Sequence, residues 1–132
     1  MKYMLDTNIC VYIIKKKPLK VLEKFTTYSR DDICISSITL AELEFGVCKS
    51  SNPLKNKLAL TIFLAGIKIL PFDDRAATQY GDIRATLERH GTPIGANDLL
   101  IAAHARSLQL TLVTNNLKEF ERVDALQVEN WI

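Results

Sequence analysis

The sequence predicts an α/β fold in which helices cover a mainly parallel central sheet. Short apolar segments that fit buried strands alternate with longer segments whose apolar residues recur every three or four positions. Serine, threonine, asparagine or aspartate residues follow several of the short segments directly, as they do at helix N-termini. Because strands and helices alternate, the strands are expected to pair in parallel through helical crossovers.

The first half of the chain fits two strands and four helices. A strand over 3–5 ends at Asp6-Thr7-Asn8, and the apolar run from Ile9 then continues as a helix until Pro18 stops it. The expected elements that follow are an amphipathic helix over 18–28, a strand over 33–35, a helix from the Ser36-Ser37 pair to about 49 and, after a linker at 50–53, a helix to about 64.

The second half repeats the alternation. A strand over 67–72 precedes the clearest helical stripe of the chain, in which the apolar residues follow one another at steps of four, three and four: Ala76, Tyr80, Ile83 and Leu87. The expected elements that follow are a loop at 91–95, a helix capped by Asn97 that runs to about 107, a strand over 110–113, a short helix around Glu119 and a last strand near 127–128.

Composition predicts one compact domain over 1–132. Hydrophobic residues make up 48% of the 132 residues and charged residues 24%, which is typical of globular proteins. The 17 basic residues exceed the 15 acidic ones by only two, a balance that neither indicates nor excludes a nucleic-acid partner. Cys10, Cys34 and Cys48 are scattered and fit neither a zinc site nor a disulfide framework. With no signal peptide and no segment that spans a bilayer, we expect a cytoplasmic protein without membrane contact.

Four acidic residues follow the predicted strands. Asp6 follows the first strand, and Glu42 lies in the helix after the second. Asp98 opens the helix after the 91–95 loop, and Glu119 comes soon after the strand over 110–113. Because ligands of open parallel sheets bind beyond the carboxyl ends of the strands, these carboxylates are expected to converge.

Each acid also has a simpler interpretation as a helix cap. Asp6 and the Asn97-Asp98 pair fit helix N-termini, while Thr39 to Glu42 and Asn116 to Glu119 match the capping-box pattern. Asp98 and Glu42 fit the cap interpretation less well, because both share a face with apolar residues, where an unpaired carboxylate is costly. Glu44 also has apolar neighbours, so helical spacing does not choose between Glu42 and Glu44.

Grouped carboxylates without histidine or cysteine are hard oxygen ligands. Such a group suits Mg²⁺ or Mn²⁺ rather than zinc. Without a cation, the carboxylates would repel one another and take up protons. With one or two ions, the group becomes a platform for phosphodiester hydrolysis by a metal-activated water.

Four blocks of the sequence resemble one known family. The blocks are Met4-Leu5-Asp6-Thr7-Asn8, Ser36 to Leu43, Gly95 to Ala105 and Leu112-Val113-Thr114-Asn115-Asn116 with Phe120. In order and spacing they resemble PIN-domain ribonucleases, and among these the VapC-type toxins of bacterial toxin–antitoxin systems. The resemblance covers essentially the whole chain and implies a PIN-like α/β/α sandwich.

The resemblance also implies an activity and partners. It implies a Mg²⁺-dependent endoribonuclease, with Mn²⁺ as a substitute, whose acidic pocket is formed here by Asp6, Glu42 and Asp98. Many relatives carry aspartate where this chain has Asn116, and a subset has asparagine there with an acid one turn on, which is Glu119 here. The implied substrate is a structured RNA such as a tRNA anticodon loop. The implied partner is a cognate antitoxin. The protein would contact DNA only indirectly, through this antitoxin.

Two other function classes stay open at this point. A phosphoacceptor signalling module needs an additional acidic pair near the first strand, an acceptor aspartate at the end of a central strand and a lysine after the last strand. Only Asp6 lies near the first strand, and no lysine ends the strand over 110–113, so this class fits poorly. A non-catalytic binding module, whose acids are only helix caps, predicts no metal dependence and no RNA turnover. An assay of Mg²⁺-dependent RNA cleavage separates these classes from the nuclease.

The sequence also predicts roles for several residues outside the four acids. Thr7 and Thr114 are expected to place hydroxyls beside the acids. His104 is interpreted as a packed or surface residue, and His90, Asp73, Asp74 and Asp82 as structural. A run of lysines is interpreted as a solvated face or an RNA path: Lys15, Lys16, Lys17, Lys20 and Lys24. An excess of aliphatic residues in the first helices indicates an interface with a second copy, in a homodimer, or with the antitoxin: Val11, Ile14, Leu19, Val21 and Leu22.

Overall fold

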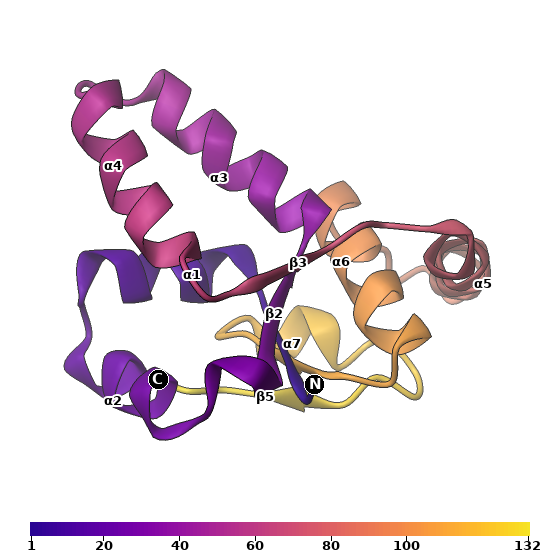
Figure 1. The fold of residues 1–132 in the computed structure, drawn as a ribbon. Coiled ribbons are helices and arrows are strands. Elements are labelled where there is room, and N and C mark those ends of the chain that lie inside the picture. The colour runs from indigo at the N-terminus through magenta and orange to yellow at the C-terminus, as the bar shows by residue number, and fades with distance from the viewer.

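A five-stranded parallel sheet organises the molecule. The structure is a computed structural model that describes residues Met1–Ile132. The strands are β1 (Tyr3–Leu5), β2 (Ile33–Ser36), β3 (Lys68–Leu70), β4 (Thr111–Val113) and β5 (Val128–Glu129), in the order β3-β2-β1-β4-β5. Every pairing is parallel. The predicted α/β fold with helices around a parallel sheet is therefore confirmed (Figure 1).

Helices cover both faces of the sheet. They are α1 (Thr7–Lys15), α2 (Leu19–Thr27), α3 (Ser37–Lys49), α4 (Pro53–Leu64), α5 (Asp74–Arg89), α6 (Ala96–Ser107) and α7 (Leu117–Phe120). A short 3₁₀ turn, η1 (Arg30–Asp32), precedes β2 and was not expected from the sequence. The elements that differ most from the prediction are β3, which is shorter than 67–72, and α1, which begins at Thr7 rather than Ile9.

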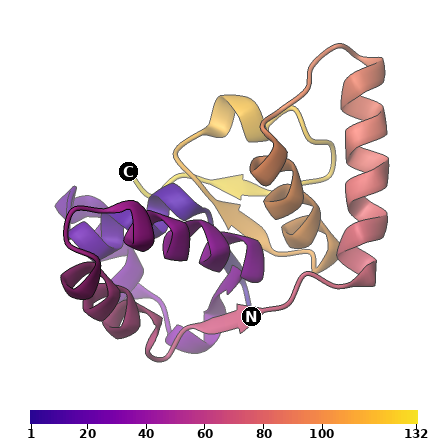
Figure 2. The ribbon, with the colours of Figure 1, turned by 90° about the horizontal axis from the view of Figure 1, so that it is seen from above.

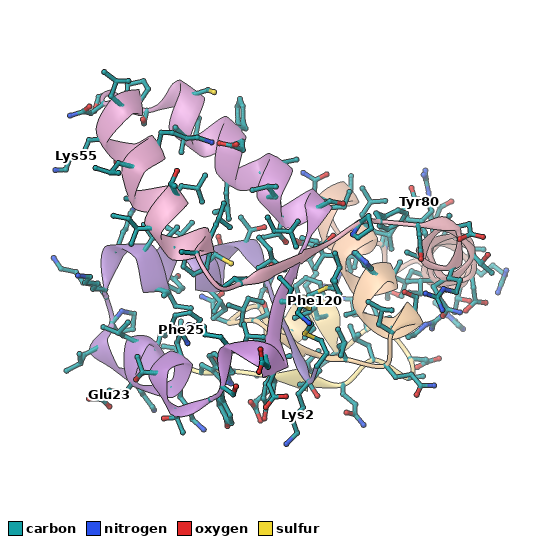
Figure 3. All side chains as sticks on the ribbon, in the orientation of Figure 1. Lys2, Glu23, Phe25, Lys55, Tyr80 and Phe120 are labelled. Carbon is teal, nitrogen blue, oxygen red and sulfur yellow. The ribbon has the colours of Figure 1, made fainter.

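The alternation of side chains along each strand creates two cores. Tyr3 and Leu5 of β1 pack with α1 to α4 on one face, whereas Met4 packs with α5 to α7 on the other. Figure 2 shows α6 between the sheet and α5, which forms the outer wall on that side. In Figure 3, Phe25 and Phe120 lie inside the molecule, while Lys2, Glu23 and Lys55 point away from it. None of the helices is both long and apolar enough to cross a membrane.

The strand order places the switch in topology between β1 and β4. From β1 the chain moves to β2 and β3 on one side, and it returns to β4 and β5 on the other. Open α/β sheets bind ligands in the crevice at such a switch, beyond the carboxyl ends of the strands. In this protein the residues at that crevice are Asp6, directly after β1, and Thr114, directly after β4.

Candidate active site

Asp6 lies at the bottom of the crevice with both carboxylate oxygens bound. Its side chain is only 3% exposed. The backbone N–H of Thr7 donates to Oδ1 at 2.7 Å, and the hydroxyl of Thr114 donates to Oδ2 at 2.8 Å. Burial raises the pKa of Asp6, and these two hydrogen bonds act in the opposite direction. Asp6 is the N-cap of α1, as the sequence predicts, and it also faces the other acids.

Glu42 reaches the crevice from α3. The Thr7 hydroxyl donates to Glu42 Oε1 at 2.5 Å, and Asn97 Nδ2 donates to Oε2 at 3.1 Å. The sequence left Glu42 and Glu44 as alternatives, and the structure separates them. Glu44 points elsewhere and forms a salt bridge to Lys57 at 2.7 Å. Glu42 is therefore the α3 carboxylate of the site.

Asp98 and Glu119 form the outer part of the site. Asp98 is half-buried near the N-terminus of α6, and its carboxyl group is hydrogen-bonded to Glu119. Burial raises the pKa of Asp98 to about 7, and the negative charges of Asp6, Glu119 and Glu42 add to the increase. The acids around Asp98 therefore disfavour its ionised form.

Glu119 is held by donors from two loops. The backbone N–H of Gly95 donates to Oε1 and Asn116 Nδ2 donates to Oε2, both at 2.6 Å. Partial burial opposes the ionisation of Glu119, but these hydrogen bonds outweigh it and lower the pKa. Asn116 thus binds Glu119 through its amide nitrogen, so the two candidates for the fourth position act as one hydrogen-bonded pair.

The cap interpretation is correct for Asp6 and holds in part for Asp98 and Glu119, which lie in the first turns of α6 and α7, but it is wrong for Glu42. The N-cap of α3 is Ser36, which leaves Glu42 beyond the first turn and excludes a Thr39 to Glu42 capping box. The N-cap of α6 is Gly95, and it makes no side-chain cap hydrogen bond. In α7, the backbone N–H of Asn116 donates to Thr114 Oγ1 at 3.0 Å instead of to Glu119. Only Asp6 combines a cap with a place in the acidic cluster.

The expected cap at Asn97 is therefore wrong, and its side chain belongs to the site. Asn97 is the second residue of α6, and its amide contacts Glu42 rather than its own helix. The sequence does show an asparagine beside Asp98. Because asparagine is frequent at helix N-termini, however, the expected partner was the backbone of its own helix rather than Glu42.

The residues that the sequence set aside lie away from the acids. His104 is buried, with its Nδ1 2.7 Å from Ser36 Oγ, and burial lowers its pKa. His90 is the C-cap of α5 and Asp73 its N-cap, while Asp82 binds Arg106 in a salt bridge. These contacts give each of them a structural role.

The donor set fits a hard cation. All four acids offer oxygen ligands, and burial together with the charges of the other three acids raises the pKa of Asp98 to about 7. No three His, Cys, Asp or Glu side chains lie close enough together to form a ready-made cage.

A groove leads from the acids along α1, α3 and α4. Its volume is about 920 Å³, and Thr7, Glu42 and Asn97 lie among its lining residues. Val11 and Ile14 add apolar surface to it, as the excess of aliphatic residues predicted, and Lys15 also lines it. The prediction for Val21 is wrong, because this residue is buried in the core. Leu19 is 63% exposed but does not line the groove.

Comparison with known proteins identifies close relatives. The chain matches the PIN domain over residues 3–126. It is 49% identical over 132 residues to the ribonuclease VapC2 of Haemophilus influenzae, covering 100% of this chain and 99% of that one. It is also 49% identical over 131 residues to the tRNA(fMet)-specific endonuclease VapC of Shigella flexneri, covering 99% and 98%.

Two solved complexes share the fold. VapBC2 from Rickettsia felis, bound to a DNA fragment from its promoter, gives a TM-score of 0.93 at 47% identity and covers 100% of both chains. DNA-bound VapBC from Salmonella typhimurium gives a TM-score of 0.94 at 45% identity and covers 100% of this chain and 99% of that one.

Proposed function

The chain belongs to the PIN-domain family and to its VapC ribonucleases, and from this premise we propose that it is a toxin that cleaves RNA at the crevice formed by Asp6, Glu42, Asp98 and Glu119. One observation carries the proposal. Four acids from distant parts of the chain converge at the topological switch of the sheet, although only one of them serves as a helix cap.

The reaction is hydrolysis of a phosphodiester bond. Asp6, Glu42 and Asp98 would hold Mg²⁺, or Mn²⁺ in its place, through carboxylate oxygens. The bound ion supplies an activated water and offsets the negative charge of the reacting phosphate. The chain contributes orientation: Thr114 and the Thr7 backbone fix Asp6, while Gly95 and Asn116 fix Glu119 beside Asp98. Rigid carboxylates cost less reorganisation when the substrate binds.

The substrate we propose is the anticodon loop of a tRNA. The support is the full-length identity to relatives named as tRNA(fMet)-specific endonucleases, at 49% for the protein of Shigella flexneri and 46% for that of Salmonella typhimurium. Unpaired loop nucleotides expose their backbone and bases, so they can reach a crevice at the edge of a sheet.

The decisive experiment is cleavage of purified tRNA. We expect cleavage with Mg²⁺, none with EDTA, and none with Asp6→Asn, which keeps the size of the side chain and removes its charge. Attack by water would leave 5′-phosphate and 3′-hydroxyl ends. Products with 2′,3′-cyclic phosphates would contradict this mechanism, and activity that persists in EDTA would contradict the metal.

We further propose that a cognate antitoxin occupies the groove. An occupant that reaches the end formed by Thr7, Glu42 and Asn97 would cover the acids and block cleavage. The relatives of known structure include VapBC assemblies of Rickettsia felis and Salmonella typhimurium bound to DNA, and we assign DNA contact to the antitoxin.

We place the protein in the cytoplasm as a homodimer. Native mass spectrometry with and without the product of the neighbouring gene tests this, and a monomer that binds no such product would contradict it.

A further inference from the structure

Asn97 lies between the two helices that carry Glu42 and Asp98. We propose that Asn97 is a positioning residue that keeps the Glu42 carboxylate turned toward the acidic crevice; this inference rests on the proposed nuclease function. The observation is that Glu42 is held at both oxygens by donors from two different helices. Thr7 of α1 donates to Oε1 at 2.5 Å, and Asn97 of α6 donates to Oε2 at 3.1 Å.

The chemistry of the two groups fixes the direction of this contact. An ionised carboxylate only accepts hydrogen bonds, so Asn97 must present its amide nitrogen to Glu42. A hydrogen bond to an ionised acceptor is stronger than one between neutral groups. The side chain makes no cap for its own helix, whose N-cap is Gly95. A purely local role for Asn97 is therefore excluded.

Glu42 needs to be held because its neighbours repel it. Thr7 donates to Asp6 through its backbone N–H and to Glu42 through its hydroxyl, so the two carboxylates lie close together and repel each other when both are ionised. Glutamate has a long, flexible side chain, and Glu42 is only half-buried. Without Asn97, the Oε2 side of the carboxylate would be free to turn outward, with Thr7 as its remaining anchor.

This arrangement predicts where a substitution shows its effect. A bound cation attracts Glu42 by itself, so the contribution of Asn97 is largest when the cation is scarce. We expect Asn97→Ala to raise the Mg²⁺ concentration for half-maximal cleavage by about 10-fold, the effect usual for residues that orient metal ligands. The rate at saturating Mg²⁺ should change much less. Alanine is the best helix former, so α6 should not be weakened.

The matched control is Asn130→Ala. Asn130 is exposed outside the groove, and its amide oxygen accepts from the backbone N–H of Ile132 at 3.0 Å. We expect this variant to keep the Mg²⁺ dependence of the wild type. Asn97→Asp keeps the shape of the side chain but places a negative charge against Glu42, so it should raise the Mg²⁺ requirement more than Asn97→Ala does.

Two measurements separate positioning from a general structural effect. Mn²⁺ binding to the RNA-free protein, followed by electron paramagnetic resonance, should weaken in Asn97→Ala by a factor similar to the change in Mg²⁺ requirement. In a double-mutant cycle, Asn97→Ala should have no further effect on Mn²⁺ binding in a Glu42→Ala background, because no carboxylate remains to be held. Additive effects in this cycle, or unchanged Mn²⁺ binding in Asn97→Ala, would overturn the proposal. Mn²⁺ binding without any RNA cleavage by the wild type would instead contradict the proposed function.

Discussion

The two aspartates of the site are held in opposite ways. Asp6 is buried, and both its oxygens accept hydrogen bonds from fixed donors, Thr7 N–H and Thr114 Oγ1. Asp98 is half-buried, and its partner is another carboxyl group, that of Glu119. Burial raises the pKa of both aspartates, but hydrogen-bond donors counteract it at Asp6, whereas further negative charge reinforces it at Asp98.

This difference separates two tasks that one acidic cluster has to perform. Asp6 is stable in its place whether or not a cation is bound, so it serves as the fixed reference of the site. The carboxylates of Asp98 and Glu119 repel each other when both are ionised, and a bound proton or cation reduces this repulsion. We therefore propose that the site is rigid on the side of the sheet and that the side of α6 responds to a cation.

The largest expected effect is the loss of cleavage in either aspartate variant. Asp6→Ala and Asp98→Ala should each reduce the rate of RNA cleavage by more than about 100-fold, the upper range for residues that only orient metal ligands. Relative to the wild type, the two variants should change the free energy of unfolding in opposite directions. Asp6→Ala leaves the Thr114 hydroxyl without its acceptor and should lower the free energy of unfolding by about 1–3 kcal/mol, whereas Asp98→Ala removes repulsion and should raise it.

Urea denaturation in EDTA, together with the cleavage assay, tests this pair. A folded Asp98→Ala protein with wild-type cleavage would show that Asp98 does not belong to the active site. Equal destabilisation by both variants would show that the two aspartates are not held differently.

The next prediction tests the hydrogen bond by which Thr114 holds Asp6 in place. Thr114→Val keeps the shape of the side chain but removes the donor to Asp6 and the acceptor for Asn116 N–H. Because Thr114 is fully buried, we expect a loss of about 1–3 kcal/mol in the free energy of unfolding, measured in urea. Thr111→Val, at the start of β4, is the control. Its hydroxyl makes an exposed 3.3 Å contact to Gln127, so its loss should cost under about 0.5 kcal/mol.

The fixed side of the site could be predicted from the sequence better than the responsive side. Asp6 follows a strand and begins a helix, so its place at the sheet edge follows from local pattern alone. The positions of Glu42 and Asn97 depend on how α3 packs against α6, which no local pattern contains. Spacing left Glu42 and Glu44 equivalent, and Phe45, an apolar residue three positions after Glu42 and so on the same helix face, is 65% exposed.

The capping-box patterns failed for a related reason. The Asn116 to Glu119 segment has the right residues, but the long-range donor Gly95 N–H takes Glu119 Oε1, and Thr114 takes Asn116 N–H. Tertiary contacts of this kind outweigh a local preference worth about 1 kcal/mol. The α/β fold was confirmed because alternating strands and helices determine it without such contacts.

A smaller effect tests the outer pair through Glu119. In Glu119→Gln an NH₂ group replaces one of the two carboxylate oxygens. This group only donates, so the side chain cannot accept hydrogen bonds at both positions, from Gly95 N–H and from Asn116 Nδ2. We expect about 10-fold weaker activity at limiting Mg²⁺, together with a small loss of thermal stability. Asn116→Ala removes one donor but keeps the carboxylate, so its effect on the Mg²⁺ requirement should be smaller. A stronger defect in Asn116→Ala, with unchanged metal dependence in Glu119→Gln, would assign the fourth position to Asn116.

The smallest expected effect is a dependence of stability on pH that comes from Asp98. Burial raises the pKa of Asp98 to about 7 in the folded protein, well above the usual range of an aspartate, so the folded state binds the proton more tightly than the unfolded state does. In EDTA, the contribution of Asp98 to the free energy of unfolding should therefore be greatest below about pH 4 and decrease as the pH rises to about 7. Asp98→Asn cannot ionise and should lack this decrease, so the stability difference between variant and wild type should grow in favour of the variant over that range. Mg²⁺ should reduce the difference at pH 7, because it binds the ionised form. Urea denaturation of both proteins at matched pH values measures the difference directly, and a difference that does not change with pH would mean that Asp98 ionises freely beside Glu119.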